Sequence, residues 1–285
     1  MPIRSIFIVC CLVMILFTGS EKAFAGKHYD IQKVSDSVYA AIALPSGKAA
    51  SNAMFIVTGS HVILAGAHFV QETVRELVAE IGKITQNPVR EIILTHHHSG
   101  YNYIDVDLPV NAEIITSWQT WQALKSEYRQ VKNPVTFFEK GLTLQRENLS
   151  IVLSNTDFGH SKGDLIVYVP SEGVLFTSDL VFNRSIGYMG TGFMREWVIS
   201  LEFLESLSAN IVIPGVGRVT DTEGITQFRM FMKDFLTEVL RHIEKGDSLA
   251  VTKKEFKIPQ YINLPGYRTF FEVNVERAYG ELKEK

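Results

Sequence analysis

The distribution of apolar and polar residues along the first half of the chain predicts strands alternating with helices. Two apolar runs, NAMFIV (52–57) and HVILAG (61–66), flank a short turn, which is the pattern of a β-hairpin. VREIILT (89–95) predicts a further strand. The segments 71–84 and 117–128 predict amphipathic helices. The apolar residues at helical spacing are Val74, Leu77, Val78, Ile81 and Ile84 in the first helix, and Trp118, Trp121, Leu124 and Tyr128 in the second.

The second half of the chain repeats this plan. LSIVLSN (149–155) predicts a strand, and residues 164–179 predict a hairpin with its turn at PSEG. A helix over 195–209, a strand over 210–215 and a long helix over 224–246 follow. The two hairpins, at 52–67 and 164–179, are interpreted as counterparts. The sequence therefore predicts an α/β fold of two similar halves, with sheets packed face to face and helices outside.

The first 25 residues have the pattern of a secretory signal peptide. The charged Arg4 precedes an uninterrupted apolar run, 6–17, and small residues stand at Ala23 and Ala25. The alternative is an uncleaved membrane anchor, but twelve apolar residues fall short of the ~20 that span a bilayer. We expect cleavage after Ala25, a periplasmic or secreted protein without a stable membrane span, and one mature domain over 26–285 with a C-terminal helical tail.

Cleavage changes the chemistry open to the mature chain. Both cysteines, Cys10 and Cys11, lie in the signal, so the mature chain forms no disulfide and holds a metal only with histidine and carboxylate. The net charge of the whole chain is −3, and loss of a net +1 with the signal leaves −4. With no basic patch, nucleic acid is excluded as an expected partner.

Histidines and one aspartate mark the candidate site. His96 and His98 follow directly after the strand predicted at 89–95, in LTHHHSGYN. His160 lies in a glycine-flanked turn, DFGHSKGD, and Asp179 ends the strand VLFTSD. Taken singly, each residue is more typical of a hydrogen-bonded structural group or a turn cap. Catalytic zinc commonly has three protein ligands and an open position for water, so together they predict a metal site.

These motifs, in this order, resemble the metallo-β-lactamase-fold superfamily of metal-dependent hydrolases. Its signature is Thr-His-x-His-x-Asp-His, then Gly-His, a strand-end Asp, and Pro-Gly-His-Gly. THHHSGY, GHSKGDLIVYVP, VLFTSDLVF and IVIPGVGRVTD are the matching segments. The resemblance covers nearly all of residues 28–245 and implies a four-layer αββα sandwich of two similar halves. It also implies His96, His98, His160 and Asp179 as metal ligands.

The chain departs from the family pattern at the positions of the second metal. Gly100, Tyr101 and Val216 stand where the resemblance implies an Asp and two His ligands. Ala65 stands where an Asp usually ends an early strand. The ligands of the first metal are all retained. We interpret the chain as a degenerate member with at most one metal, expected to be zinc, with iron or manganese as alternatives.

Two classes of function follow from this interpretation. The first is an exported mononuclear hydrolase of an ester, thioester or amide bond in a small molecule. Its catalytic residues would be Asp179, which orients water, serves as a general base or becomes a fourth ligand, and Tyr101, which donates to substrate or only fills space. The second is a pseudoenzyme that binds a small molecule or a protein partner. The expected loss of the second metal argues against a β-lactamase and a glutathione-thioester hydrolase.

The loop after Asp179 supplies the prediction about substrate. It places four apolar residues between glycines in a position that would overhang the pocket. They are Tyr188, Met189, Phe193 and Met194. If these side chains face the pocket, the ligand is partly apolar. The alternative is that they pack beneath the loop.

Overall fold

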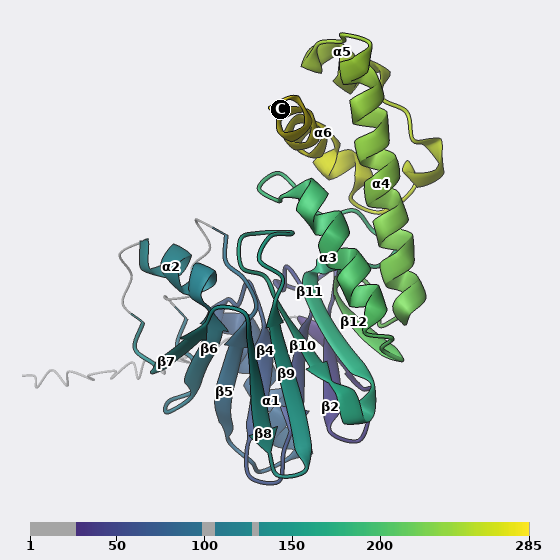
Figure 1. The fold of residues 1–285 in the computed structure, drawn as a ribbon. Coiled ribbons are helices and arrows are strands. Elements are labelled where there is room, and N and C mark those ends of the chain that lie inside the picture. The colour runs from purple at the N-terminus through teal and green to yellow at the C-terminus, as the bar shows by residue number, and fades with distance from the viewer. Residues whose placement is uncertain (1–26, 99–105, 127–130, 285) are drawn as a thin grey trace, which may run out of the picture.

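A computed structural model describes residues 27–98, 106–126 and 131–284. The predicted signal peptide, residues 1–25, lies outside the described residues, as do Gly100, Tyr101 and Tyr128. In the described part, the chain forms two β-sheets that pack face to face, with helices on both outer faces (Figure 1). The predicted α/β class and four-layer architecture are confirmed.

The first sheet has seven strands in the order in which they follow along the chain. Strands β1 to β4 pair antiparallel, and β4 to β7 pair parallel. Their bounds are β1 Tyr29–Lys33, β2 Val38–Ala43, β3 Ala53–Val57, β4 Val62–Gly66, β5 Val89–Leu94, β6 Glu113–Ser117 and β7 Val135–Phe138. Helices α1 (Gln71–Ile84) and α2 (Trp118–Ser126) connect its parallel strands.

The second sheet has five strands in the order β12-β11-β10-β9-β8. The strands β8 to β11 pair antiparallel, and β11 pairs parallel with β12. Their bounds are β8 Gly141–Arg146, β9 Leu149–Asn155, β10 Leu165–Val169, β11 Val174–Phe182 and β12 Ile211–Val216. Each sheet thus combines an antiparallel meander with a parallel pair, so the two halves share the predicted plan.

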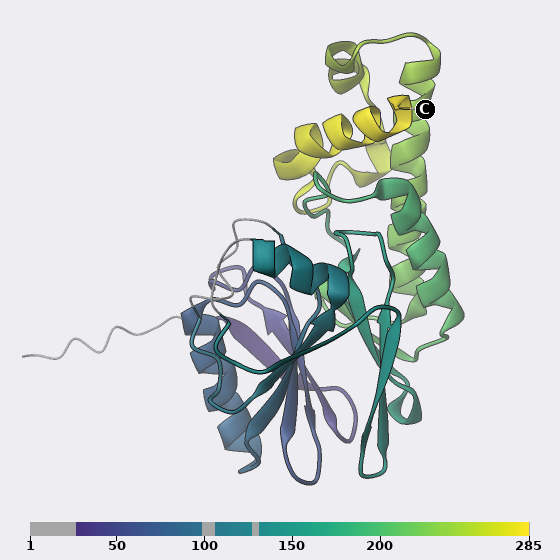
Figure 2. The same cartoon turned by 60° about the vertical axis from the view of Figure 1, so that its left-hand side comes forward.

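Three apolar clusters separate the four layers. Alternation along β4 sends Ile63 and Ala65 into the core between the sheets, and Val62 and Leu64 toward α1. In the second sheet, Phe176 joins the core between the sheets, while its neighbour Leu175 packs toward the opposite helices. Figure 2 shows these layers from the side, with α1 outside the first sheet and the C-terminal helices outside the second.

The C-terminal helices extend the second face of the sandwich. Helices α3 (Met194–Ser206) and α4 (Thr222–Glu244) lie against the second sheet, and α5 (Leu249–Glu255) and α6 (Tyr267–Lys283) pack on α4 beyond the end of that sheet (Figure 1). Asp221 caps α4 by accepting a hydrogen bond from the Glu223 N–H at 3.0 Å. In the described ranges, no helix has the length and apolarity to cross a membrane.

Most elements predicted from the apolar pattern are confirmed, with two kinds of difference. Both predicted hairpins form. In α1, Val74, Leu77 and Ile81 are buried as expected, but Val78 and Ile84 are each 39% exposed, so the buried stripe is narrower. The apolar pattern does not predict β1, β2 or β6 to β8. Of these, β7 and β8 are only partly buried and lack a clear alternation, whereas β6 is buried over four of its five residues.

Candidate metal centre

The candidate site lies at the end of the sheets where β4 and β5 finish. His68 follows β4 by two residues, and His96 and His98 follow β5. These strands are parallel neighbours, with Gly66 opposite Leu94 in the register. Because the carboxyl ends of parallel strands meet at one edge of a sheet, residues far apart in the sequence are brought together there.

The second half of the molecule supplies the remaining groups. His160 lies in the turn between β9 and β10, and Asp179 lies within β11. Strand β12 passes very close to this aspartate, and a Cβ atom on Gly215 would overlap Asp179 Oδ1. Only glycine allows this approach, which accounts for the glycine at this point of β12.

Four imidazoles converge at this place. One ring nitrogen from each of His68, His96, His98 and His160 lies within 4.8 Å of the other three. The Nε2 atoms of His98 and His160 are 2.6 Å apart, and those of His68 and His96 are 3.0 Å apart. Within the described ranges, no other group of histidine, cysteine or acidic residues meets the same criterion for holding a metal.

Asp179 is the carboxylate of this cluster. Its Oδ2 atom lies 3.4 Å from His68 Nε2 and 3.7 Å from the Nε2 atoms of both His96 and His160. Burial by itself would raise the pKa of Asp179, but the hydrogen bond from His68 and the surrounding imidazoles outweigh it and hold the pKa below its ordinary value. The group is therefore an anion at neutral pH.

Three of these histidines, His96, His98 and His160, are neutral at pH 7 because their pKa values are lowered. Burial, reinforced by neighbouring imidazoles, lowers the pKa of His98 to about 4 and holds that of His96 well below its ordinary value. Burial also lowers the pKa of His160 to about 3, against the attraction of Asp179. Because only a neutral imidazole has a free lone pair for a metal, this environment keeps the rings ready to bind one.

Unsatisfied polar atoms show that this cluster suits a cation. Asp179 Oδ1 is buried and has no hydrogen-bond partner among the described residues. Two Nε2 atoms at 2.6 Å share at most one proton between them, whereas a metal ion would engage both lone pairs. Imidazole and carboxylate donors suit zinc, iron and manganese. The residues present therefore fit a divalent metal ion.

Two residues, Thr191 and Asp164, hold histidines of the cluster in place from outside. Thr191 Oγ1 lies 3.2 Å from His98 Nδ1, so the other ring nitrogen is directed into the cluster. Asp164 holds the turn that carries His160 by accepting hydrogen bonds from the Ser161 N–H, at 2.9 and 3.1 Å, and from the Ser161 hydroxyl. Burial raises the pKa of Asp164 to about 6.

Helix α6 holds the loop that carries Thr191. Asn274, fully buried, accepts from the Met189 N–H at 2.8 Å and donates to the Gly187 carbonyl at 3.0 Å. Arg277 donates to the Gly192 carbonyl at 2.6 Å. Glu281, one helical turn after Arg277, accepts hydrogen bonds from the N–H groups of Met194 and Arg195 at the start of α3. The C-terminal helix is thus connected to the site through the loop.

A cavity of about 710 Å³ opens beside the cluster, and His68, His98, His160 and Asp179 line it. Its apolar wall comes from the loop after β11 and from α6. The apolar lining residues are Phe182, Ile186, Tyr188, Phe193, Val216 and Phe270. Of the four loop residues considered from the sequence, Tyr188 and Phe193 line the cavity, whereas Met189 and Met194 are buried in the core. Two of the four side chains therefore face the cavity, and the other two pack beneath the loop.

The structure brings together four of the residues predicted from the sequence: His96, His98, His160 and Asp179. Tyr101, predicted as a catalytic residue, lies outside the described residues. Val216 lines the cavity, and Ala65 lies in the core between the sheets, away from it.

Sequence reasoning missed His68, Thr191 and Asn274. The sequence does contain a signal for His68, because this residue follows the strand predicted at 61–66 just as His96 follows the strand predicted at 89–95. Thr191 and Asn274 carry no local signal, since their roles depend on how α6 packs against the loop.

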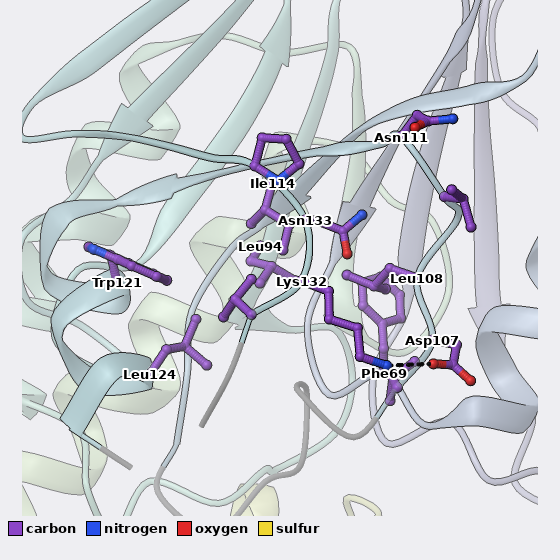
Figure 3. A pocket seen from close by; sticks show the side chains of 14 residues that line it. Phe69, Leu94, Asp107, Leu108, Asn111, Ile114, Trp121, Leu124, Lys132 and Asn133 are labelled. Carbon is purple, nitrogen blue, oxygen red and sulfur yellow. Dashed lines mark hydrogen bonds and ion pairs between the residues drawn. The ribbon is translucent and has the colours of Figure 1, made fainter. Parts of the chain in front are cut away.

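A second, apolar cavity of about 570 Å³ lies on the helix side of the first sheet (Figure 3). Phe69 and Leu94 form part of its lining, although they lie next to His68 and near His96 in the chain. The lining residues include one ion pair, Lys132 to Asp107 at 3.5 Å, and no histidine. This cavity therefore does not share the chemistry of the metal centre.

Comparison with known proteins gives consistent results. The family described as "ODP family beta lactamase" matches residues 49–197. A metallo-beta-lactamase type 2 from Bacillus sp. (strain 170) is 23% identical over 181 residues, covering 60% of this chain and 68% of the relative. A hydroxyacylglutathione hydrolase from Legionella pneumophila (strain Paris) is 27% identical over 135 residues, covering 47% of this chain and 50% of the relative.

Solved structures share the fold. The metallo-beta-lactamase from Pontibacter korlensis superposes with a TM-score of 0.61 at 18% identity, over 72% of this chain and 99% of that structure.

Proposed function

From the premise that the chain belongs to the ODP family of beta lactamases, we propose that it is an exported metal-dependent hydrolase with a single metal centre. The reaction class is hydrolysis of an ester, thioester or amide bond in a small molecule. The observation that carries this proposal is the convergence of four buried or half-buried imidazoles on a buried carboxylate with an unpartnered oxygen.

The ligands of the proposed metal are His96, His98 and His160, with Asp179 beside them. Zinc suits this set, and iron and manganese are the alternatives. A divalent ion held there supplies a polarised carbonyl and a water of lowered pKa. Thr191 fixes the ring of His98, and Asp164 fixes the turn of His160, so the chain itself sets the ligand positions.

Asp179 acts as an acceptor that orients water or as a ligand. Its lowered pKa makes it a weak base at neutral pH, so the role of general base is the least favoured of the three suggested by the sequence. Its Oδ1 atom, which has no hydrogen-bond partner among the described residues, lies against Gly215 of β12. The role of Tyr101 stays a prediction from the sequence.

The cavity beside the centre supports a proposal about the class of substrate. Aromatic side chains from the loop and from α6 would bury an apolar part of the substrate, and Tyr188 lies 6.3 Å from both His98 and Phe270, measured between ring centroids. Lys162 also lines this cavity and provides a positive charge. A small molecule with an apolar group and a negative charge fits these walls.

Export rests on the N-terminal pattern of the sequence. Residues 1–25 have the charge, apolar run and small residues of a signal peptide, and the predicted mature chain has no cysteine. We propose a periplasmic or secreted enzyme. Secretion can be measured by locating the full-length protein in cell fractions and by sequencing its mature N-terminus.

Metal content tests the proposed function directly. The mature chain, purified without chelator, is analysed by mass spectrometry beside His98→Ala and His61→Gln. His61 is a matched control because its ring contacts Glu91 at the other end of β4. We expect about one metal ion per chain in the native and control proteins, a loss in His98→Ala, and metal-dependent hydrolysis in a screen of aryl esters and thioesters.

Two outcomes would contradict the proposal in different ways. Bound metal without hydrolysis of any ester, thioester or amide would leave a metal-binding protein without the activity. Absence of metal from all three proteins, at equal stability, would favour the second candidate function, a pseudoenzyme that uses the same cavity to bind a partner. This second candidate is supported by Ala65 and Val216, because neither side chain can bind a metal.

A further inference from the structure

We propose that His68 is a ligand of the metal, so that the centre has four imidazoles and one carboxylate and holds a five- or six-coordinate ion. This inference rests on the proposed function, because it concerns the same centre. Nothing in the family pattern quoted for this sequence supplies a histidine at this position. The structure places it there, beyond the end of β4.

The backbone presents the His68 ring to the cluster. His68 has a φ of 54°, in the left-handed region that residues other than glycine rarely occupy. Ser178, which precedes Asp179, is in the same region with a φ of 47°. Non-glycine residues are held in this conformation only where surrounding structure enforces it, so the packing around β4 fixes the direction in which the His68 ring points.

His68 contacts two members of the cluster directly, as a metal ligand would. Its Nε2 atom is 3.0 Å from His96 Nε2 and 3.4 Å from Asp179 Oδ2, and its side chain is 5% exposed. The His68 ring is parallel to that of His98, with centroids 5.6 Å apart. The same nitrogen thus faces two of the groups that would hold the ion.

The number of donors decides what kind of ion fits. Tetrahedral zinc in catalytic sites has three protein ligands and one open position, and four protein ligands close it. Four imidazoles with Asp179 make five donors, one more than a tetrahedral ion accepts. An ion that accepts five or six ligands, as iron and manganese do, takes all five donors and can keep a position for water.

Cobalt(II) is the probe for this coordination number. The metal-free chain is titrated with Co²⁺, and its visible absorption is compared among native protein, His68→Gln and His61→Gln. Tetrahedral Co²⁺ absorbs strongly in the visible, and five- or six-coordinate Co²⁺ absorbs weakly. His61 is the matched control, because it directly precedes β4 whereas His68 follows it, and its ring contacts Glu91 rather than the cluster.

We expect weak absorption in the native and control proteins. In His68→Gln, loss of one donor leaves three imidazoles and Asp179, so the absorption becomes stronger. The affinity for Co²⁺ also falls, but loss of an outer hydrogen-bond partner lowers the affinity by about 10-fold or more as well, so the spectrum decides. An unchanged spectrum in His68→Gln, whatever its affinity, would show that His68 only donates a hydrogen bond to Asp179. That result would overturn this inference and leave the metal centre intact.

A second measurement does not depend on any variant. X-ray absorption fine structure of the native chain loaded with Co²⁺ counts the imidazoles bound to the ion. Four imidazoles support the inference, and three overturn it even if His68→Gln fails to fold. If the native chain binds no Co²⁺, Zn²⁺, Fe²⁺ or Mn²⁺, the metal centre itself is wrong, which is a failure of the proposed function and is distinguishable from a count of three.

Discussion

Strands β4 and β5 carry a buried polar cluster at each end, and the two clusters differ in how their groups are satisfied. At the starting end, His61 Nε2 lies 3.3 Å from Glu91 Oε2, and the Arg146 Nε atom lies 3.1 and 3.2 Å from the two Glu91 oxygens. At the finishing end, four imidazoles surround Asp179, and no lysine or arginine forms an ion pair with this carboxylate in the described part of the chain.

The difference distinguishes a cluster that joins the two sheets from the candidate metal centre. Glu91 is in the first sheet and Arg146 ends β8 in the second, so their ion pair joins the sheets with matched charges. Asp179 has one oxygen without a partner among the described residues. Since buried polar groups are normally satisfied, the cluster whose protein partners leave atoms unpaired is the one prepared for an external ligand.

Lowering the pH should change the unfolding free energy mainly through the histidines at the finishing end of β4 and β5. The pKa values of His98 and His160 are about 4 and about 3 in the folded chain, below the ~6.5 of an unfolded histidine. Between these values the unfolded chain binds more protons, so the unfolding free energy falls as the pH falls from 6.5 toward 3. Asp164, with its pKa raised to about 6, opposes part of this trend because its folded form takes up a proton first.

We therefore expect the unfolding free energy of the metal-free chain to fall by about 3 kcal/mol or more between pH 7 and pH 4, at about 1.4 kcal/mol for each unit of pKa displacement. Urea unfolding at fixed pH measures it. The double variant with His98→Gln and His160→Gln should lose much of this dependence, and His61→Gln should keep it. A double variant as sensitive to acid as the native chain would contradict the assignment.

Breaking the ion pair at the starting end should give the next largest effect. Glu91→Gln leaves Arg146 facing a neutral amide in a partly buried position, and we expect the unfolding free energy to fall by about 2 kcal/mol. The matched variant is Glu147→Gln, which alters an exposed contact with the Gly59 N–H and should cost less than about 0.5 kcal/mol. Both variants should bind metal as the native chain does, and a loss of metal in Glu91→Gln would mean that the two ends are coupled.

Removing the hydrogen bond between Thr191 and His98 should have a smaller effect. Thr191→Val removes the hydroxyl that meets His98 Nδ1, so the affinity for metal should fall by about 10-fold, which corresponds to about 1.4 kcal/mol. Thr191→Ser keeps the hydroxyl and should restore the affinity. Competition with a chelating dye measures both. Equal loss in the two variants would show that the loop, and not the hydroxyl, matters.

The sequence predicts the shared fold well because its signals are local. Apolar alternation in 52–66 and helical spacing in 71–84 depend only on neighbours along the chain, and both elements form as predicted. The histidines at 96, 98 and 160 are visible because they follow strand ends in a known order. What they do when they meet Asp179 is still a prediction.

The parts of the site that the sequence did not reveal depend on tertiary contacts. His68 is a single histidine after an apolar strand, and its meaning appears only when β4 and β5 are placed side by side. Asn274 lies 85 residues from Met189 in the chain, yet it fixes that part of the loop by two hydrogen bonds to the backbone. No pattern of spacing within a short window carries such information.

The sharpest test of the comparison replaces the carboxylate of each cluster by its amide. In the metal-free chain, Asp179→Asn should lower the unfolding free energy by about 1 kcal/mol, because the amide oxygen still accepts from His68 while the negative charge that the imidazoles stabilise is lost. Glu91→Gln, the same chemical change, should cost about twice as much or more because a satisfied ion pair is lost. Urea unfolding of both variants in the presence of chelator measures the difference, and metal binding should be lost only in Asp179→Asn. If Asp179→Asn costs as much as Glu91→Gln and still binds metal, Asp179 is a structural charge, and the contrast between the two ends of β4 and β5 is wrong.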